Sequence, residues 1–363
     1  MTSGKFEIHN VQLALDKKHF FITANKSHPG NRDFYSLDVT TGKLQSIFEA
    51  DGYHEVQVSP DEKWFSVRFS TAIVPWEMFI APNKPATKLE QITHSTTSQF
   101  QAYSWRKPSV ISFRASDGEM IYGRLYEPLP NKKNGAAVLF VHGAGYLQNA
   151  HNYWSYYFRE FMFHHLLTDL GYTVLDLDYR ASEGYGRNYR TAIYRHMGGR
   201  DLQDYVEAKQ FMVQQYQLDK NRFGIYGGSY GGFMTLMALL TQPDEFACGA
   251  ALRSVTDWAH YNHEYTSNIL NYPDTDPLAY QKSSPIYYAQ NLKKPLILLH
   301  GMVDDNVQFQ DVVRLSQRFI ELGKMDWDLA VYPVESHSFK EAYSWYDEYR
   351  RILDLFEKYL HQH

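Results

Sequence analysis

The chain has 363 residues, one cysteine, and 41 acidic against 36 basic side chains, which give a formal net charge of −5. This balance, without any run of like charge, gives no reason to expect a nucleic acid partner, and a single cysteine excludes an internal disulfide. No apolar stretch reaches the ~18 residues that a membrane-spanning helix needs, and the opening residues MTSGKFEIHNVQLALD lack the pattern of a secretory signal.

The first hundred residues contain a repeat with an offset of 45 positions, between VQLALDKKHFFITA and VQVSPDEKWFSVRF. The matching pairs are Val11/Val56, Gln12/Gln57, Asp16/Asp61, Lys18/Lys63 and Phe20/Phe65. Each copy predicts two short strands around a polar turn, followed by further strands, which is the size of one propeller blade. We therefore expect a partial β-propeller of about two blades over residues 1–108; two unrelated hairpins are the alternative.

Two blades cannot close a ring, and a blade buries its faces only against its neighbours. We therefore expect a further part of a propeller, or a homo-oligomer, to cover these sheets.

The pattern changes near residue 109, where compact apolar strands begin to alternate with longer helical segments. The predicted strands are 136–143, 172–179, 223–227, 247–252, 295–301 and 328–333, and the predicted helices are 152–169, 200–217, 230–241, 306–323 and 341–360. Near-continuous apolar strands separated by helices indicate a mostly parallel sheet that is covered on both faces. Residues 109–363 are thus predicted to form one α/β domain, with its ligands at the carboxyl ends of the strands.

Ser229 stands in the sequence GIYGGSYGG, between a predicted strand and a predicted helix, and fits the motif G-x-S-x-G. In this context the motif is typical of the nucleophile elbow of the α/β-hydrolase fold. The turn also aims the backbone N–H of the next residue, Tyr230, at an oxyanion formed at the serine. The alternative is a tight strand-to-helix turn without chemistry.

A serine nucleophile needs a general base and an acid that orients it. In the α/β-hydrolase fold both follow the serine, first the acid and then the histidine, each just after a strand. Asp304 and Asp305 follow the strand PLILLHG, and His337 follows the last strand. One of the two aspartates is better explained as a helix cap than as a catalyst, and a residue of a surface loop is the alternative for the histidine.

Other sites are weaker or excluded. His142, in VHGAGYLQNAHNYW, stands where an HG-type loop lends a second oxyanion donor, although a tight strand exit explains its glycine equally well. The histidines of HEVQV and HEYTS lack a second histidine four positions on, and the chain has no C-x-x-C motif or P-loop. No metal or cofactor is expected.

The motifs GGSYGG, HGMVDDNV, YRASEGYG and RHMGGRDLQD together resemble the prolyl oligopeptidase family of serine peptidases, most closely its dipeptidyl-peptidase IV branch. The resemblance covers residues from about 110 to 360, and the two blades are similar to the end of that family's N-terminal propeller. It implies Ser229 as nucleophile, Asp304 as the acid, His337 as the base and Asn306 as a ligand of a substrate carbonyl. It also implies a pocket of proline size, lined by Val255, Trp258, Tyr261, Tyr265 and Val307.

The chain departs from this branch at His142, where a tyrosine is usual, and at Ser338, where a glycine is usual. It also lacks the part of the propeller that carries the acidic pair for a substrate's free amine. We expect a serine peptidase that cleaves after proline or small residues. A carboxylesterase acting on small acyl esters and a catalytically silent interaction module are the alternatives. Without the family, Tyr261 and Tyr265 are equally well explained as neighbours on one amphipathic helix.

Overall fold

The computed structural model describes residues 2–143 and 146–361, and the chain divides into two compact units. The first unit consists of Met1–Val110, Ala150–His165 and Gly184–Arg187. The second consists of Ile111–Asn149, Leu166–Glu183 and Asn188–His363. Two segments of the later chain therefore belong to the first unit. The predicted division at residue 108 remains a prediction.

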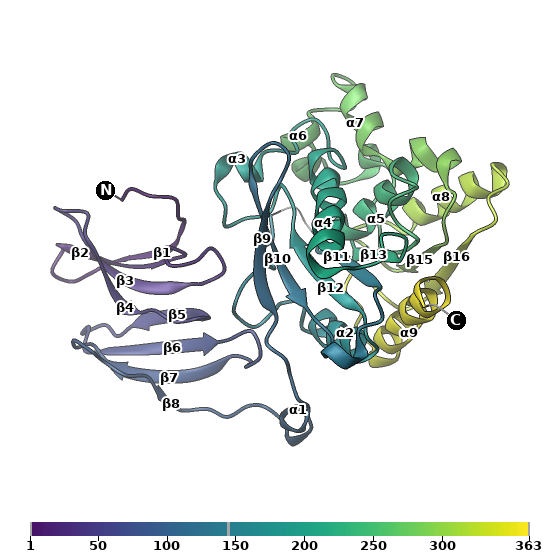
Figure 1. Ribbon diagram of the computed structural model, residues 1–363. Coiled ribbons are helices and arrows are strands. Elements are labelled where there is room, and N and C mark those ends of the chain that lie inside the picture. The colour runs from purple at the N-terminus through teal and green to yellow at the C-terminus, as the bar shows by residue number, and fades with distance from the viewer. Residues whose placement is uncertain (1, 144–145, 362–363) are drawn as a thin grey trace. The chain divides into compact units, whose positions relative to one another are not determined.

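The first unit contains two four-stranded sheets, each an antiparallel meander in chain order (Figure 1). The strands of one sheet are β1 (Ile8–Leu13), β2 (His19–Ala24), β3 (Asp33–Asp38) and β4 (Leu44–Phe48). The strands of the other are β5 (Tyr53–Val58), β6 (Trp64–Ser70), β7 (Glu77–Pro82) and β8 (Glu90–Gln91). This is the architecture that the repeat predicts.

The two meanders repeat in detail at the turn between their first two strands. Lys17 and Glu62, which are 45 positions apart, both adopt the left-handed conformation, with φ of 56° and 55°. The residues before them, Asp16 and Asp61, each accept a hydrogen bond from the backbone N–H two positions on, at 2.7 and 3.1 Å. An aspartate side chain at this place stabilises the turn, which is why it recurs in both copies.

The two sheets share one apolar core built on phenylalanines. Phe34 from β3 stacks on Phe21 with ring centroids 5.8 Å apart, and it meets Phe65 from the second sheet edge-to-face at 5.6 Å. Phe48 also contacts Phe65 at 5.6 Å. Each sheet thus buries one face against its neighbour, as expected for adjacent blades.

The second unit is built on an eight-stranded sheet, in the order β16-β15-β14-β13-β11-β12-β10-β9. Its strands are β9 (Ser109–Arg114), β10 (Met120–Tyr126), β11 (Ala137–Val141), β12 (Thr173–Asp178), β13 (Phe223–Gly228), β14 (Cys248–Leu252), β15 (Leu296–Gly301) and β16 (Trp327–Tyr332). From β12 to β16 all neighbouring pairs are parallel, whereas β10 pairs antiparallel with β12. The chain reverses its direction across the sheet at β11, which has β12 on one side and β13 on the other. Ligands of such sheets bind at the carboxyl ends of the strands near this point.

Helices cover both faces of this sheet (Figure 1). The helices of the chain are α1 (Ser98–Ala102), α2 (Phe158–Asp169), α3 (Arg187–Arg190), α4 (Arg200–Tyr216), α5 (Tyr230–Thr241), α6 (His263–Leu270), α7 (Pro277–Ser283), α8 (Gln310–Glu321) and α9 (Ala342–Leu360), with 3₁₀ turns at Pro130–Lys132, Trp258–His260 and Pro285–Asn291.

Two glycines show which helix lies on which face. A methyl group on Gly224 of β13 would meet Phe356 of α9 at 2.8 Å, and one on Gly249 of β14 would meet Thr235 of α5 at 2.9 Å. Gly224 pairs with the residue before Gly249, so the two glycines point to opposite faces of the sheet. The helices α9 and α5 therefore cover opposite faces, as predicted for a buried parallel sheet.

Two predicted helices begin later than expected. The segment predicted from residue 306 becomes helical only at Gln310, because the carboxylate of Asp304 accepts the backbone N–H groups of Asn306 and Val307 in a turn of its own. The segment predicted from residue 152 becomes helical at Phe158. In the part of the chain that the structure describes, no helix combines the length and apolarity needed to cross a membrane.

Candidate active site

Ser229 lies in a sharp turn between β13 and α5. Its backbone has φ of 60° and ψ of −118°, and its N–H donates to the carbonyl of Leu252 at 2.9 Å. A residue other than glycine in such a conformation costs on the order of 1–3 kcal/mol, and such residues occur mainly at functional sites. The turn therefore has the strained geometry of a nucleophile elbow.

The two glycines of the G-x-S-x-G motif lie close to the last residue of β11, Val141. A methyl group placed on Gly227 or Gly231 would come within 2.2 or 2.0 Å of the carbonyl oxygen of Val141. Gly228 has no such constraint, because its methyl group would lie 3.6 Å from the nearest atom, in the guanidinium of Arg253. The turn thus needs glycine at the two motif positions and tolerates a side chain between them.

Asp304 and His337 form a hydrogen-bonded pair at the carboxyl ends of β15 and β16. Nδ1 of His337 lies 2.9 Å from Oδ2 of Asp304, and Oδ1 accepts the N–H groups of Asn306 and Val307 at 3.0 and 2.9 Å. One carboxylate therefore both caps a turn and contacts the imidazole. The roles of helix cap and of catalytic acid, which the sequence presented as alternatives, are both compatible with Asp304. Asp305 uses its backbone carbonyl to accept from Gln308 at 3.3 Å.

Asp304 is held in its ionised form. Burial by itself raises the pKa of this carboxyl, but hydrogen bonds from His300 and His337 outweigh burial and hold the pKa well below its usual range. Nε2 of His300 lies 3.2 Å from Oδ2 of Asp304 and 2.9 Å from the carbonyl of Val307. A buried anion with several donors can orient an imidazole and stabilise its protonated form.

The Ser229 hydroxyl makes no hydrogen bond to His337 in the described residues. In serine hydrolases without substrate this contact is often long, and it tightens when substrate binds. Arg253 connects the loop that carries His337 to the strand beside the elbow: it donates to the carbonyl of His337 at 3.2 Å, and the residue before it, Leu252, accepts the N–H of Ser229.

The first candidate for the oxyanion site is the backbone N–H of Tyr230, the first residue of α5. An N–H group in the first turn of a helix has no acceptor within the helix. The side chain of Tyr230 is buried: its hydroxyl donates to Asp201 at 2.6 Å, and its ring stacks on Tyr179 with centroids 5.6 Å apart.

The second candidate, His142, is fully buried, with partners at both ring nitrogens. Nδ1 lies 3.0 Å from the carbonyl of Gly143, and Nε2 lies 3.0 Å from the hydroxyl of Ser182 and 3.5 Å from Asp178. Burial lowers the pKa of this imidazole, but the hydrogen bond and charge of Asp178 outweigh burial, so the pKa is raised. A donor role at the oxyanion would require this buried ring to turn away from these partners. In the structure the ring instead connects the segment after β11 with residues at and after the end of β12.

The aromatic residues predicted for the substrate pocket lie together. Trp258 and Tyr261 meet edge-to-face at 5.5 Å, and Tyr265 lies 6.0 and 5.8 Å from these two rings. The hydroxyl of Tyr261 donates to Oδ1 of Asn306 at 2.7 Å, which connects the rings to the turn of Asp304. Val255 and Val307 are buried beside these segments.

Tyr261 and Tyr265 do not share a helix. The side chain of Asn262 caps the start of α6 by accepting the N–H groups of Glu264 and Tyr265, so Tyr261 precedes the helix. The alternative that made these tyrosines neighbours on one amphipathic helix is therefore wrong. An asparagine before a helical segment is the signal that could have shown this.

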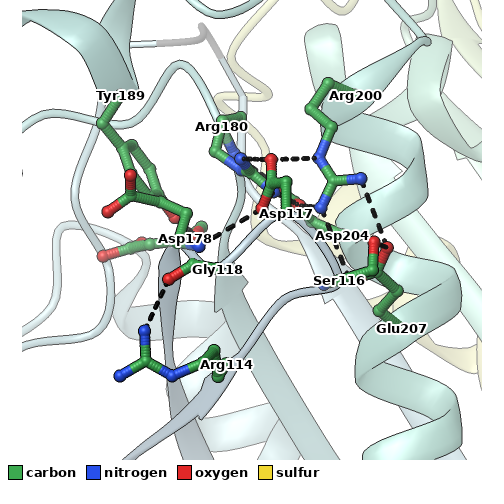
Figure 2. Close-up of polar contacts among 11 residues, drawn as sticks. Arg114, Ser116, Asp117, Gly118, Asp178, Arg180, Tyr189, Arg200, Asp204 and Glu207 are labelled. Carbon is green, nitrogen blue, oxygen red and sulfur yellow. Dashed lines mark hydrogen bonds and ion pairs between the residues drawn. The ribbon is translucent and has the colours of Figure 1, made fainter.

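The first turn of α4, which carries Asp201, is fixed by a network of charges that sequence reasoning missed. Figure 2 shows Asp117 of the β9–β10 turn between Arg180 and Arg200. Arg180 lies 2.6 Å from both Asp117 and Asp204, and Arg200 lies 3.3 Å from Glu207. Asp201, in the same turn, accepts a hydrogen bond from the hydroxyl of Tyr230, the residue after Ser229.

Comparison with known proteins identifies the family of this chain. The sequence model of the prolyl oligopeptidase family matches residues 157–363, and that of the dipeptidyl peptidase IV N-terminal region matches residues 1–76. The chain belongs to the prolyl oligopeptidase family.

Curated relatives in this family include dipeptidyl peptidase 8 of Homo sapiens, 28% identical, and of Mus musculus, 35% identical, each over 360 residues. The match covers 94% of this chain and 40% of each relative. A probable dipeptidyl-aminopeptidase B of Trichophyton verrucosum is 27% identical over 94% of this chain and 39% of its own length. The chain thus spans about two fifths of the length of these relatives.

The crystal structure of Porphyromonas gingivalis dipeptidyl peptidase 4 has the same fold, with a TM-score of 0.88 at 22% identity. It covers 99% of this chain, and this chain covers 51% of it. The predicted α/β-hydrolase fold preceded by a partial propeller is therefore confirmed.

Proposed function

We propose that this chain carries the catalytic site of a serine peptidase that hydrolyses peptide bonds after proline or a small residue. The observation that carries the proposal is the hydrogen bond between His337 and the buried Asp304, at the same sheet edge as the strained turn of Ser229. The names of the relatives, dipeptidyl peptidase and dipeptidyl-aminopeptidase, support a peptide substrate.

In this mechanism the hydroxyl of Ser229 attacks the carbonyl carbon of the scissile bond, and His337 takes its proton. Nδ1 of His337 faces Asp304, so Nε2 is the nitrogen left for the serine. The N–H of Tyr230 stabilises the oxyanion. His337 then passes the proton to the leaving amine, and water, activated by the same imidazole, releases the acyl group.

A substrate pocket lined by the predicted aromatic residues suits a proline ring. Flat aromatic walls, as provided by Trp258, Tyr261 and Tyr265, pack well against a rigid pyrrolidine. Because Oδ1 of Asn306 accepts from Tyr261, its amide group is the part left to donate to a substrate carbonyl.

The test combines an active-site label with a panel of substrates. We expect a fluorophosphonate to label Ser229, and an X-Pro aryl amide with a free amino terminus to be hydrolysed. Variants Ser229→Ala and His337→Ala should lose both activities. Turnover of aryl esters without any amide turnover would instead identify a carboxylesterase. A folded protein that is not labelled would identify a silent interaction module.

We further propose that a homo-oligomer covers the open edge of the first sheet. Every residue of β1 is exposed, and three of them are large and apolar: Ile8, Val11 and Leu13, at 38%, 54% and 50%. Exposed strand edges of this kind pair readily with other chains. Sedimentation analysis should show a self-associated species that Val11→Lys weakens. A wild-type chain that stays monomeric at micromolar concentration would contradict the proposal.

A further inference from the structure

Arg253 occupies an unusual position directly after β14. Its backbone has φ of 42°, a left-handed value for a residue other than glycine, and its N–H donates to the carbonyl of Leu299 in β15 at 2.7 Å. The residue is only 9% exposed. A strained and nearly buried arginine at the carboxyl edge of the sheet suggests a role for its side chain.

The guanidinium group contacts the loop of His337 and the helix that follows it. Nη1 donates to the carbonyl of His337 at 3.2 Å, and Nη2 donates to both oxygens of Glu348 at 2.8 and 3.0 Å. The same group lies 5.0 Å from the ring of Phe339 and 5.2 Å from that of Trp345. These contacts determine both the place and the plane of the guanidinium.

Arg253 also adjoins the serine elbow through the main chain, because the carbonyl of the preceding residue, Leu252, accepts the N–H of Ser229 at 2.9 Å. Its guanidinium is the nearest group to the open side of Gly228, where a methyl group, which the glycine lacks, would lie 3.6 Å from Cζ. Arg253 therefore connects the two segments: its main chain follows the residue bonded to Ser229, and its side chain donates to the backbone of His337. In the described residues no side-chain hydrogen bond joins the elbow directly to the His337 loop, so Arg253 supplies a connection between them in addition to the strands of the sheet.

The energetics of the contact also favour a geometric role. Glu348 is completely buried, and replacing a buried ion pair with apolar side chains is often neutral or stabilising. The pair is thus weak evidence for stability alone. A misplacement of about 1 Å between reacting groups can lower a rate about 10²-fold.

We propose that Arg253, anchored by Glu348, is a positioning residue that sets the distance between His337 and Ser229. The inference rests on the proposed serine hydrolase function. Arg253 itself touches neither substrate nor the reacting atoms in this arrangement; it acts through the backbone of His337.

The experiment compares Arg253→Met, Arg253→Lys and the double variant Arg253→Met/Glu348→Leu with wild type. The control is Lys209→Met, which removes another ion pair, from the buried Lys209 to the partly exposed Glu245 at 2.9 Å, near the start of β13 and so at the opposite ends of the strands. Readouts are the rate of fluorophosphonate labelling, kcat and KM for an aryl ester, and the melting temperature.

For Arg253→Met we expect a loss of about 10- to 100-fold in labelling rate and kcat, with KM nearly unchanged. Arg253→Lys, which keeps a donor for the carbonyl, should recover part of the loss. The double variant should regain the wild-type melting temperature but remain slow, whereas Lys209→Met should lower the melting temperature without slowing the reaction. Wild-type labelling by the double variant would overturn the inference.

A readout independent of activity separates this inference from the proposed function. The low-field proton resonance of the His337–Asp304 hydrogen bond should be present in wild type and should broaden or shift in Arg253→Met and in the double variant. If wild type shows the resonance but is never labelled by the fluorophosphonate, the proposed function fails. A broadened or shifted resonance in the variants would still support the positioning role of Arg253. An unchanged resonance in both variants would overturn the positioning role whatever the activity.

Discussion

The turn that carries Ser229 and the loop that carries His337 lie at the same edge of one sheet, but different interactions hold them. The serine turn is held by backbone sterics: Gly227 and Gly231 let it pass within contact of the Val141 carbonyl. The His337 loop, residues 333–341, is held by side chains, and above all by Glu335 and Arg253.

Glu335 stabilises the His337 loop from within through hydrogen bonds to its backbone. It is completely buried, and its two oxygens accept the backbone N–H groups of Lys340 and Glu341 at 2.7 and 3.1 Å. Its own carbonyl packs against Gly301, where a methyl group would come within 2.2 Å. The nucleophile is thus held by backbone contacts to the neighbouring strands, whereas the base depends on side-chain contacts within its loop and from Arg253.

The largest effect on activity is expected from a substitution of Asp304, the carboxylate that contacts His337. Asp304→Asn should lower kcat on the order of 10³- to 10⁴-fold, because an amide no longer selects the productive imidazole tautomer or stabilises its charge. Asp305→Asn is the matched control and should be nearly neutral, since Asp305 contributes a backbone carbonyl here. Equal losses in both variants would contradict the assignment of the acid.

The turn that carries Ser229 is expected to be destabilised by a single added methyl group. Gly231→Ala should destabilise the fold by about 3 kcal/mol or more, because the new methyl would lie 2.0 Å from the Val141 carbonyl. Helix propensity alone would favour alanine there by up to about 1 kcal/mol, so the sign of the effect is informative. Gly228→Ala is the control and should change the unfolding free energy by less than about 1 kcal/mol. Chemical denaturation measures both.

The support of the elbow by Asp201 depends on pH. Burial is the main cause that raises the pKa of this carboxyl to about 6, above its ordinary value of 3.8. A raised carboxyl pKa favours the protonated form in the folded state, so ionisation destabilises the protein as pH rises from about 4 through 6. Asp201→Asn should therefore gain stability relative to wild type between pH 4 and 8, by up to about 3 kcal/mol.

Thermal melts of wild type and Asp201→Asn at pH 4.5 and pH 8 would test this prediction. A difference between the two proteins that does not change with pH would show that Asp201 has no raised pKa in the folded state.

The smallest effect is expected from Glu335→Gln in the His337 loop. Burial raises the pKa of Glu335, but hydrogen bonds from Ser344 and from the backbone of Lys340 and Glu341 outweigh it, so the pKa is lowered. A lowered carboxyl pKa stabilises the fold above the ordinary value of 4.5, and this contribution is lost as pH falls below it. The variant should lose about 1–2 kcal/mol at pH 7 and progressively less in acid. Equal losses at pH 7 and pH 3.5, measured by denaturant titration, would contradict this.

Several features of the fold and of the site could be predicted because they depend on residues that are close together in the chain. The aspartates of the two blade turns and the capping oxygen of Asp304 act on backbone within three positions. The glycines around Ser229 stand in a short local motif, although the carbonyl that they approach belongs to the distant Val141. Local rules of turn and cap chemistry describe such contacts well.

Other features could not be predicted, since they join distant parts of the chain. Arg253 meets the carbonyl of His337 across 84 positions and Glu348 across 95. Asp201 meets Tyr230 across 29 positions. In the sequence, each is one charged residue among many, and no spacing distinguishes it from a solvated side chain. His142 illustrates the same limit: its place after a strand was clear, but the direction of its ring was not.

For this protein the amino-acid sequence by itself determined the alternation of strands and helices, the repeat of two blades, and the chain order of serine, acid and histidine. Each of these depends on periodicity or on residues close together in the chain. Only the tertiary structure decided that Asp304 rather than Asp305 contacts the imidazole, that His142 turns toward Asp178, and that Arg253 connects the strand beside the elbow to the His337 loop. Those contacts depend on which strands lie side by side, and burial makes each of them sensitive to displacements that no local pattern records.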